Sequence, residues 1–290
     1  MKKIFILFIL MLILCSCSKK EALESSDDST RVVSLAPNIT EIIFAIGAED
    51  LLVGRTSACD YPQEAVGQIP VIGGFGKPAL ELLLRTEPNL VLQTDLEDEV
   101  IGQAIDRIGL TRKRIECSKL EHIASAIREI GVLLDRKEVA EEVAQKFEME
   151  FDRLTTIELK SDRLPKVFVE LWDNPLITVG RKSFVSELVT VAGGSNIGDA
   201  IQREYFNTES EWVVKTNPDI IICLYMSPTG VAREKPLRRT GWSSVSALVN
   251  GDVYDEFDSN VLLRPGPRIT EGIESLRKCF EQWQNRQNRL

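Results

Sequence analysis

The side chains that could perform chemistry are unevenly supplied in this sequence, and histidine is the scarcest of them. The chain holds one histidine, His122. A single imidazole disfavours a histidine-rich zinc site and any mechanism that needs a well-placed histidine base. The sequence also lacks a Gly-x-Ser-x-Gly, Walker or His-Glu-x-x-His motif. We therefore expect no catalytic residues, no metal ligands and no enzymatic activity.

Two glutamates, Glu81 and Glu211, occupy the same register of an internal repeat. Residues 81–92 (ELLLRTEPNLVL) align with residues 211–222 (EWVVKTNPDIII), and Glu, Thr and Pro are identical in register. Each copy predicts a short helical turn, a break marked by proline and a continuous apolar run. Such a run is typical of a strand buried on both faces of a parallel sheet.

A weaker repeat of a strand and a helix precedes each of these segments. The predicted pairs are strand 31–35 with helix 40–46, which ends at Gly47, and strand 166–170 with helix 184–192, which ends at Gly193-Gly194. Glycine just past a helix suits a left-handed stop. Alternating strands and helices in both halves predict an α/β protein with two Rossmann-like lobes, each with a parallel central sheet.

Length and composition agree with two lobes and exclude several classes of protein. The 290 residues exceed the usual span of one core. Apolar residues make up 43% and charged residues 27%, which excludes collagen-like, disordered and polytopic membrane proteins. The formal charge of −9 argues against a nucleic-acid partner, because a nucleic-acid binder normally presents a basic face.

Residues 120–164 are almost free of glycine and proline and predict a helical connection between the lobes. Ile123, Ile127, Ile130 and Leu134 form a stripe that predicts a first helix packed on the N-terminal lobe. Residues 137–159 then predict one long helix that spans both lobes as a stiff rod. Its predicted apolar face consists of Val139, Val143, Phe147, Phe151 and Leu154.

The N-terminus is predicted to direct export. Residues 1–3 are basic at two positions and residues 4–14 are an apolar run, too short for the roughly 20 residues of a membrane-spanning helix. Residues 14–17 (LCSC) look like a bacterial lipobox, which predicts lipidation of Cys17; the alternative is an ordinary signal peptide with incidental cysteines. Loss of residues 1–16 removes Lys2 and Lys3, so the formal charge changes from −9 to −11.

These patterns divide the chain into five predicted segments. They are a signal peptide (1–16), a flexible tether (17–30), an N-terminal lobe (31–135), an interlobe helix (136–164) and a C-terminal lobe (165–290). Four cysteines remain in the lobes, and Cys59 with Cys117 is the one pair we consider, because both lie in the first half. The sequence leaves open whether they form a disulfide.

The motifs together resemble the substrate-binding proteins of ABC importers whose lobes are joined by one long helix. The most similar subgroup is the vitamin B12 (cobalamin) binders, alongside siderophore and haem binders. The resemblance extends over residues 31–283. It is carried by residues 31–47 (RVVSLAPNITEIIFAIG), 59–62 (CDYP), the two repeats, 193–197 (GGSNI) and 264–269 (RPGPRI).

The resemblance implies a ligand held between the lobes, at the carboxyl ends of the strands. The matching positions are Pro37, Asn38, Tyr61, Phe75, Trp172, Tyr205, Asn260 and Arg264. For the aromatic residues the alternative is core packing, and Arg264 either pairs with an anionic group of the ligand or fixes its own loop. Phe75 stands where cobalamin binders often have Trp, and Asn260 where an Asp occurs.

The same resemblance implies the partners. Glu81 and Glu211 correspond to acids, one per lobe, that dock on arginines of two identical permease subunits, and a cytoplasmic ATPase completes the importer. The alternative is an ordinary acid in a first helical turn. The protein would be anchored by its lipid at a membrane, in the periplasm or at the cell surface.

No resident cofactor is implied, and the expected cargo is a corrinoid. An iron-siderophore or haem receptor is the alternative, because Lys77, Arg181, Arg203 and Arg264 could form a basic site for an anionic chelate. An exported hydrolase is a minor alternative. The single histidine favours a ready-made chelate over a bare metal ion as cargo.

Overall fold

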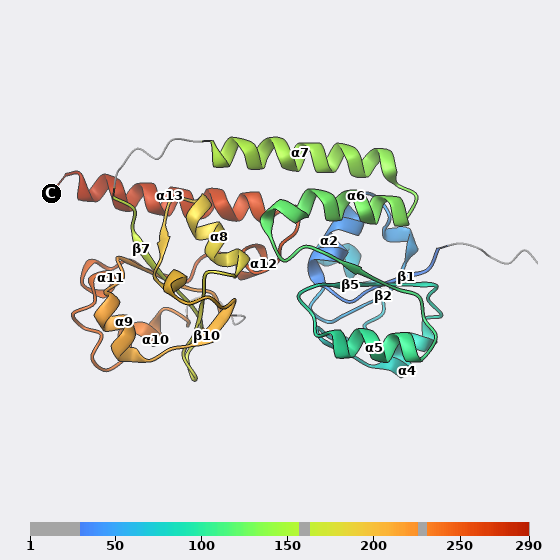
Figure 1. Cartoon of the computed structure of the whole chain (residues 1–290), viewed down its shortest axis with the longest axis horizontal. Coiled ribbons are helices and arrows are strands. Elements are labelled where there is room, and N and C mark those ends of the chain that lie inside the picture. Colours follow the sequence, from blue (N-terminus) through green and yellow to red (C-terminus); the bar gives the residue numbers. More distant parts are fainter. Residues whose placement is uncertain (1–29, 157–162, 226–230, 290) are drawn as a thin grey trace, which may run out of the picture.

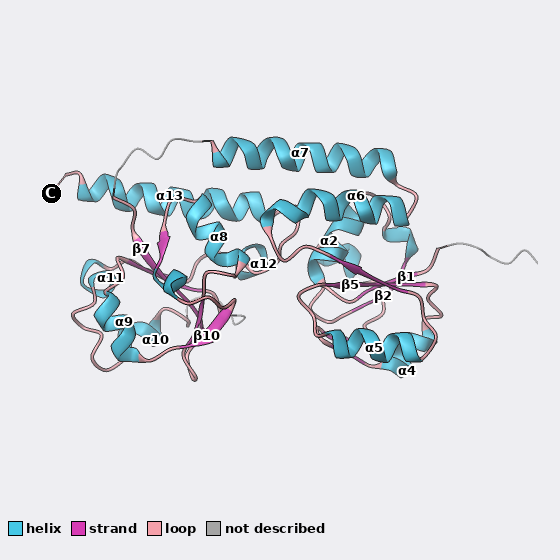
Figure 2. Cartoon of the chain, viewed as in Figure 1, coloured by secondary structure: helices cyan, strands magenta, loops and turns pink. Residues whose placement is uncertain are grey.

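The computed structural model describes residues 30–156, 163–225 and 231–289. It shows two lobes side by side, and a layer of long helices runs along one side of both (Figure 1). We refer to residues 30–135 as the N-lobe and to residues 163–225 and 231–289 as the C-lobe. Figure 2 shows the strands gathered in a separate sheet in each lobe. The predicted signal peptide (1–16) and the predicted tether from Cys17 to residue 29 lie outside the described residues.

The N-lobe sheet is parallel, with strand order β2-β1-β5-β6. Its strands are β1 (Val32–Ser34), β2 (Leu52–Arg55), β5 (Leu90–Thr94) and β6 (Arg112–Ile115). The helices around it are α2 (Pro37–Ala45), α3 (Gln63–Val66), α4 (Leu80–Arg85), α5 (Glu99–Arg107) and α6 (Ile123–Leu133), with short 3₁₀ helices η1 (Glu49–Leu51) and η2 (Leu120–His122). A small hairpin pairs β3 (Gly73–Gly74) with β4 (Lys77–Pro78).

The C-lobe sheet has the strand order β10-β8-β7-β11-β12, and β9 pairs with β7. Its strands are β7 (Lys166–Trp172), β8 (Ile177–Val179), β9 (Ser195–Asn196), β10 (Tyr205–Asn207), β11 (Ile220–Cys223) and β12 (Val253–Tyr254). The helices are α8 (Phe184–Val191), η3 (Ile197–Ala200), α9 (Ser210–Thr216), α10 (Glu234–Arg238), α11 (Ser246–Asn250), α12 (Ser259–Leu262) and α13 (Ile269–Gln287). The β7–β11–β12 core is parallel, whereas β8 and β10 add an antiparallel edge that the sequence patterns did not predict.

The two repeats form equivalent units, as predicted. The first copy is α4 followed by β5, and the second is α9 followed by β11. Their apolar runs are buried on both faces, as at Val91 and Ile221, because helices or the helical layer cover each sheet on both sides. The predicted strand and helix before each copy are β1 with α2 and β7 with α8, and positive-φ Gly47 and Gly193 follow these helices.

The helical layer consists of α6, α7 (Lys137–Thr155) and α13, and α7 lies along both of the others (Figure 1). The predicted stripe of α6 is buried. The predicted face of α7 is shifted, because Val139 is exposed whereas Ala140 and Ala144 are buried. A Cβ on Gly131 of α6 would lie 2.1 Å from the Cβ of Ala140, so only small residues fit where the two helices meet.

The four cysteines of the lobes are free thiols, and all are buried. Cys59 lies 3.2 Å from the Thr56 hydroxyl, and Cys117 lies 2.9 Å from that of Thr94. The considered pair is therefore not joined in this structure.

Within the described ranges, no helix combines the length and the apolar character that crossing a bilayer requires. The described residues also contain no group of three His, Cys, Asp or Glu side chains placed to hold a metal ion.

Candidate ligand-binding site

The predicted aromatic contacts all lie at the surface. Tyr61, Phe75, Trp172 and Tyr205 keep 40–50% of their surface exposed. Tyr61 lies in the loop after β2, Phe75 at the tip of the β3–β4 hairpin, Trp172 at the end of β7 and Tyr205 at the start of β10. Core packing, the alternative for these side chains, is thus excluded for all four.

Pro37 and Asn38 are placed differently, because both are buried. The Asn38 amide donates to the Sγ of Cys117 at 2.8 Å and to the Pro265 carbonyl of the C-lobe at 3.3 Å. Asn38 therefore joins the N-lobe to the C-lobe, and neither Asn38 nor Pro37 presents its side chain to solvent.

Arg264 forms an ion pair across the lobes. Its guanidinium donates to the two carboxylate oxygens of Asp60, in the N-lobe, at 2.5 and 3.1 Å. It also donates to the Asn260 side chain of its own lobe at 2.7 Å. Burial alone would raise the pKa of Asp60, but the Arg264 guanidinium outweighs it and holds that pKa below its usual range. Arg264 therefore fixes both its own loop and the Asp60 loop.

A second interlobe ion pair lies beside the first. Arg268 donates to both carboxylate oxygens of Glu41 on α2, at 2.9 and 2.7 Å, and Glu41 is only 5% exposed. The Arg268 guanidinium also stacks over the Tyr61 ring, 3.7 Å from its centroid. One residue of the C-lobe thus orients a predicted ligand contact of the N-lobe.

In the C-lobe, Trp172 stands next to a buried charge network. Glu170 is fully buried and accepts two hydrogen bonds from Arg239, at 2.9 and 2.7 Å, and one from the Tyr225 hydroxyl. Arg239 also binds Asp173 at 2.5 Å, and Asp173 in turn binds Lys235 at 3.0 Å. Every charge in this network has an opposite partner, as burial requires.

Two cavities lie close to these residues. One, of about 350 Å³, is lined by Trp172, Asp173, Asn174, Tyr225, Val231 and Lys235. The other, of about 830 Å³, lies between the lobes, and its lining includes Lys119 from the N-lobe and Arg181, Lys182 and Glu204 from the C-lobe. Most residues that line the second cavity have polar or charged side chains, and none of the predicted aromatic contacts is among them.

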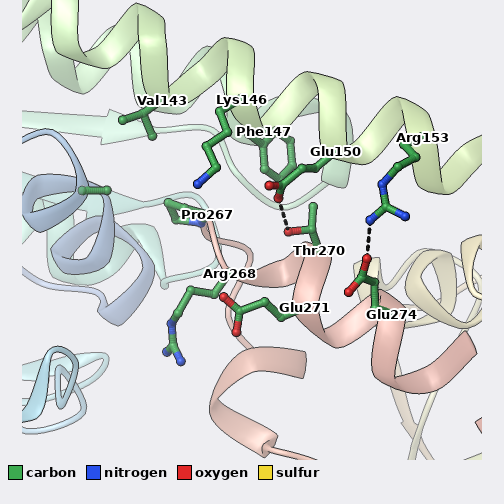
Figure 3. A pocket seen from close by; sticks show the side chains of 11 residues that line it. Val143, Lys146, Phe147, Glu150, Arg153, Pro267, Arg268, Thr270, Glu271 and Glu274 are labelled. Atoms are coloured by element: carbon green, nitrogen blue, oxygen red, sulfur yellow. Dashed lines mark hydrogen bonds and ion pairs between the residues drawn. The ribbon is translucent and has the colours of Figure 1, made fainter. Parts of the chain in front are cut away.

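A third cavity, of about 460 Å³, lies in the helical layer between α7 and α13 (Figure 3). Glu150 of α7 accepts a hydrogen bond from Thr270 at 3.2 Å, and Arg153 pairs with Glu274, so these side chains join α7 to α13. The predicted ligand contacts are absent from its lining. Arg268 lies at its edge, with its guanidinium pointing away from α7 (Figure 3).

Glu97, which follows β5, supports the hairpin that carries Phe75. It is 4% exposed, and its carboxylate accepts hydrogen bonds from the backbone N–H groups of Gly76 and Thr94, both at 3.3 Å. Burial raises the pKa of Glu97 from 4.5 to about 7, although the two N–H groups oppose the rise.

We expect this pKa to make the protein less stable as pH rises from 5 to 8. An unfolded chain loses the Glu97 proton near pH 4.5 whereas the folded protein keeps it to about pH 7. The free energy of unfolding should fall across that interval by about 2–3 kcal/mol and change no further above it. Denaturant titrations at several pH values measure the slope.

Glu97→Gln should remove most of that slope, whereas Glu64→Gln, at an exposed position of α3, should keep it. An unchanged slope in Glu97→Gln would contradict the assignment to this carboxyl group.

Glu81 and Glu211 are exposed in the first turns of α4 and α9. Neither has an ion pair with any other described residue. Figure 1 shows α4 and α9 on the side of the two lobes that faces away from the helical layer. The two acids therefore lie on the same side of the molecule, one on each lobe.

The structure reveals functional neighbours that sequence patterns missed. Asp60 and Arg268 lay within the quoted motifs CDYP and RPGPRI, so the motifs could have pointed to them. Glu41 also lay within a quoted motif, that of residues 31–47. Tyr225 and Arg239 belong to no quoted motif, and only the fold brings them to their partners.

Comparison with known proteins gives consistent likenesses. A family model described as periplasmic binding protein matches residues 32–256. An uncharacterised ABC transporter substrate-binding lipoprotein of Bacillus subtilis is 28% identical over 255 residues, which cover 85% of this chain and 78% of that protein. A vitamin B12-binding protein of Vibrio parahaemolyticus is 28% identical over 257 residues, covering 87% of this chain and 89% of that protein.

Solved structures agree with these relatives. The periplasmic vitamin B12 binding protein of Vibrio cholerae superposes with a TM-score of 0.78 at 25% identity, covering 88% of this chain and 98% of that one. A periplasmic haem-binding protein from Roseiflexus gives the same TM-score and identity, covering 88% and 99%. These likenesses confirm the two-lobed α/β fold and the resemblance that the motifs carry.

Proposed function

The chain belongs to the periplasmic binding protein family, and we propose that it captures a corrinoid of the vitamin B12 type and delivers it to an ABC importer. The family comprises solute-binding transport proteins and not enzymes. Its relatives include vitamin B12-binding and haem-binding proteins, and substrate-binding proteins of ABC transporters work with a permease and an ATPase.

The observation that favours a corrinoid is the pairing of the arginines near the predicted contacts. Arg264 is paired with Asp60, Arg268 with Glu41, and Arg239 with Glu170. A haem or a catecholate siderophore carries acidic groups that call for unpaired cations, whereas cyanocobalamin is neutral overall. Exposed aromatic rings beside neutralised charges suit a large, uncharged and partly apolar ligand.

A haem or iron-siderophore receptor is the second candidate, and one observation favours it. Arg181 and Lys182 are exposed and line the cavity between the lobes, where they could meet an anionic chelate.

Calorimetric titration of the purified protein distinguishes the two candidates. Cyanocobalamin should bind one-to-one with submicromolar affinity, and haemin and a ferric catecholate should bind far more weakly. A flat trace with cyanocobalamin together with saturation by haemin or the ferric chelate would overturn the corrinoid proposal.

We extend the proposal to the membrane. Glu81 and Glu211 are proposed to contact the two permease subunits, because a twofold partner is best met by matching charges on two similar lobes. Cys17 is proposed to carry the lipid that anchors the protein outside the cytoplasm, which the lipoprotein relative supports. Incorporation of labelled fatty acid into the wild type and its absence from Cys17→Ser is the check on the anchor.

A further inference from the structure

The cavity beside Trp172 is too small for a whole macrocycle but suits one ring system. Its volume of about 350 Å³ lies near the lower end of ligand pockets, which span roughly 300–1,000 Å³. Trp172 and Tyr225 form its aromatic walls, with ring centroids 6.1 Å apart and planes tilted by 51°. Trp172 is half exposed, so a ligand can reach its face.

The polar atoms of both rings are already bound within the protein. The Trp172 Nε1 donates to the Asn174 carbonyl at 3.0 Å, and the Tyr225 hydroxyl donates to Glu170. Glu170 is held in turn by Arg239, which stacks 4.3 Å from the centroid of Trp242. The rings are therefore fixed in orientation. Trp172 is 50% exposed and offers its face to a ligand, whereas Tyr225 is 7% exposed and lies against Trp172 on the protein side.

One donor remains at the rim of this cavity. The Lys235 ammonium binds Asp173 at 3.0 Å, and an ammonium group has three N–H donors. Two acids, Glu170 and Asp173, balance the two cations Arg239 and Lys235. The cavity thus presents aromatic faces, no net charge in its network and a donor at its edge.

We propose that this cavity is a separate subsite for an aromatic bicycle that hangs from the main body of the ligand. The bicycle lies against the exposed face of Trp172, which Tyr225 supports from the protein side, and Lys235 donates to an acceptor on the group that links it to the ligand. The proposal rests on the corrinoid function, since cobalamin carries a benzimidazole on a ribose phosphate. In this proposal the C-lobe recognises the benzimidazole base, and this contact is separate from the aromatic contacts Tyr61 and Phe75 of the N-lobe.

Cyanocobalamin and dicyanocobinamide test the subsite, because they share the corrin ring and differ in the base and its linker. The wild type should bind cyanocobalamin about tenfold more tightly, as one additional aromatic contact provides. Trp172→Ala should bring cyanocobalamin down to the affinity of dicyanocobinamide. Its half-exposed ring can be removed without opening a core cavity.

Two further variants serve as matched comparisons. Lys235→Met should lose part of the preference, and Phe75→Ala on the other lobe should weaken both corrinoids by the same factor. Circular dichroism and thermal melting verify that each variant is folded.

The outcomes separate this subsite from the function on which it rests. Equal wild-type affinity for the two corrinoids, or a preference that persists in Trp172→Ala, overturns the subsite and leaves the corrinoid function intact. Binding of neither corrinoid overturns the corrinoid function itself, and the subsite with it.

Discussion

Reversing the charge at both Glu81 and Glu211 to Lys should reduce ligand uptake by cells to background while leaving ligand affinity unchanged. Both side chains are exposed, and neither has an ion pair among the described residues, so their loss costs the fold little. In the proposed complex each acid meets an arginine, and a lysine there opposes like charge to like charge, which costs several kcal/mol. Uptake of labelled cobalamin and a parallel calorimetric titration measure the two quantities.

The matched control places the same charge change on the opposite side of the molecule. Glu138 and Glu142 are exposed on α7, in the helical layer (Figure 1). Glu138→Lys with Glu142→Lys should leave uptake unchanged, and each single reversal on α4 or α9 should give an intermediate loss. Uptake that survives the reversal of both Glu81 and Glu211 would remove the docking proposal.

Arg268→Ala should lower the free energy of unfolding by about 3–5 kcal/mol, because it leaves Glu41 buried without its bidentate partner. Arg264, 3.8 Å from Glu41, compensates only in part, since it is already bound to Asp60. The variant should also weaken ligand binding, because Tyr61 loses the guanidinium that stacks on its ring. Denaturation in urea measures the first effect and calorimetry the second.

A double variant distinguishes an unpaired buried charge from a general loss of packing. Arg268→Met with Glu41→Gln removes both charges and should recover most of the lost stability. Arg153→Ala breaks the exposed pair with Glu274 and should cost at most about 1 kcal/mol. A double variant as unstable as Arg268→Ala would show that the charge on Glu41 is not the cause.

The parts of the fold that depend on local pattern could be predicted from the sequence. The two repeats gave α4 with β5 and α9 with β11, because a proline-marked break before an apolar run is legible within 12 residues. The face of α7 was wrong at Val139, because its register is decided by the contact of Ala140 with Gly131 on another helix. The antiparallel edge of the C-lobe sheet was also not predicted. Its strands β8 and β10 are short, and their pairing depends on contacts between separate segments of the chain.

For the candidate site too, local motifs identified individual residues, whereas their partners are brought to them by the fold. Of the residues taken from the motifs, Trp172 lies at the carboxyl end of β7 and Tyr61 in the loop after β2. Phe75 instead lies at the tip of the β3–β4 hairpin, Tyr205 begins β10 and Arg264 follows α12. The partner of Arg264, Asp60, lies 204 residues away, and a single sequence carries no signal that joins them. Asn38 was assigned to the ligand by its motif, and the structure places its amide against Cys117 and Pro265.

The paired charges between the lobes have a consequence for partner choice. Because Arg264 and Arg268 bind acids of the other lobe, these pairs contribute to the mutual angle of the lobes and so to the separation of α4 and α9. In the proposed complex that separation must match the separation of the arginines on the permease. A substitution at these interlobe ion pairs is therefore expected to change the separation of α4 and α9. It would alter how well the receptor fits a given importer without altering any residue that touches the permease.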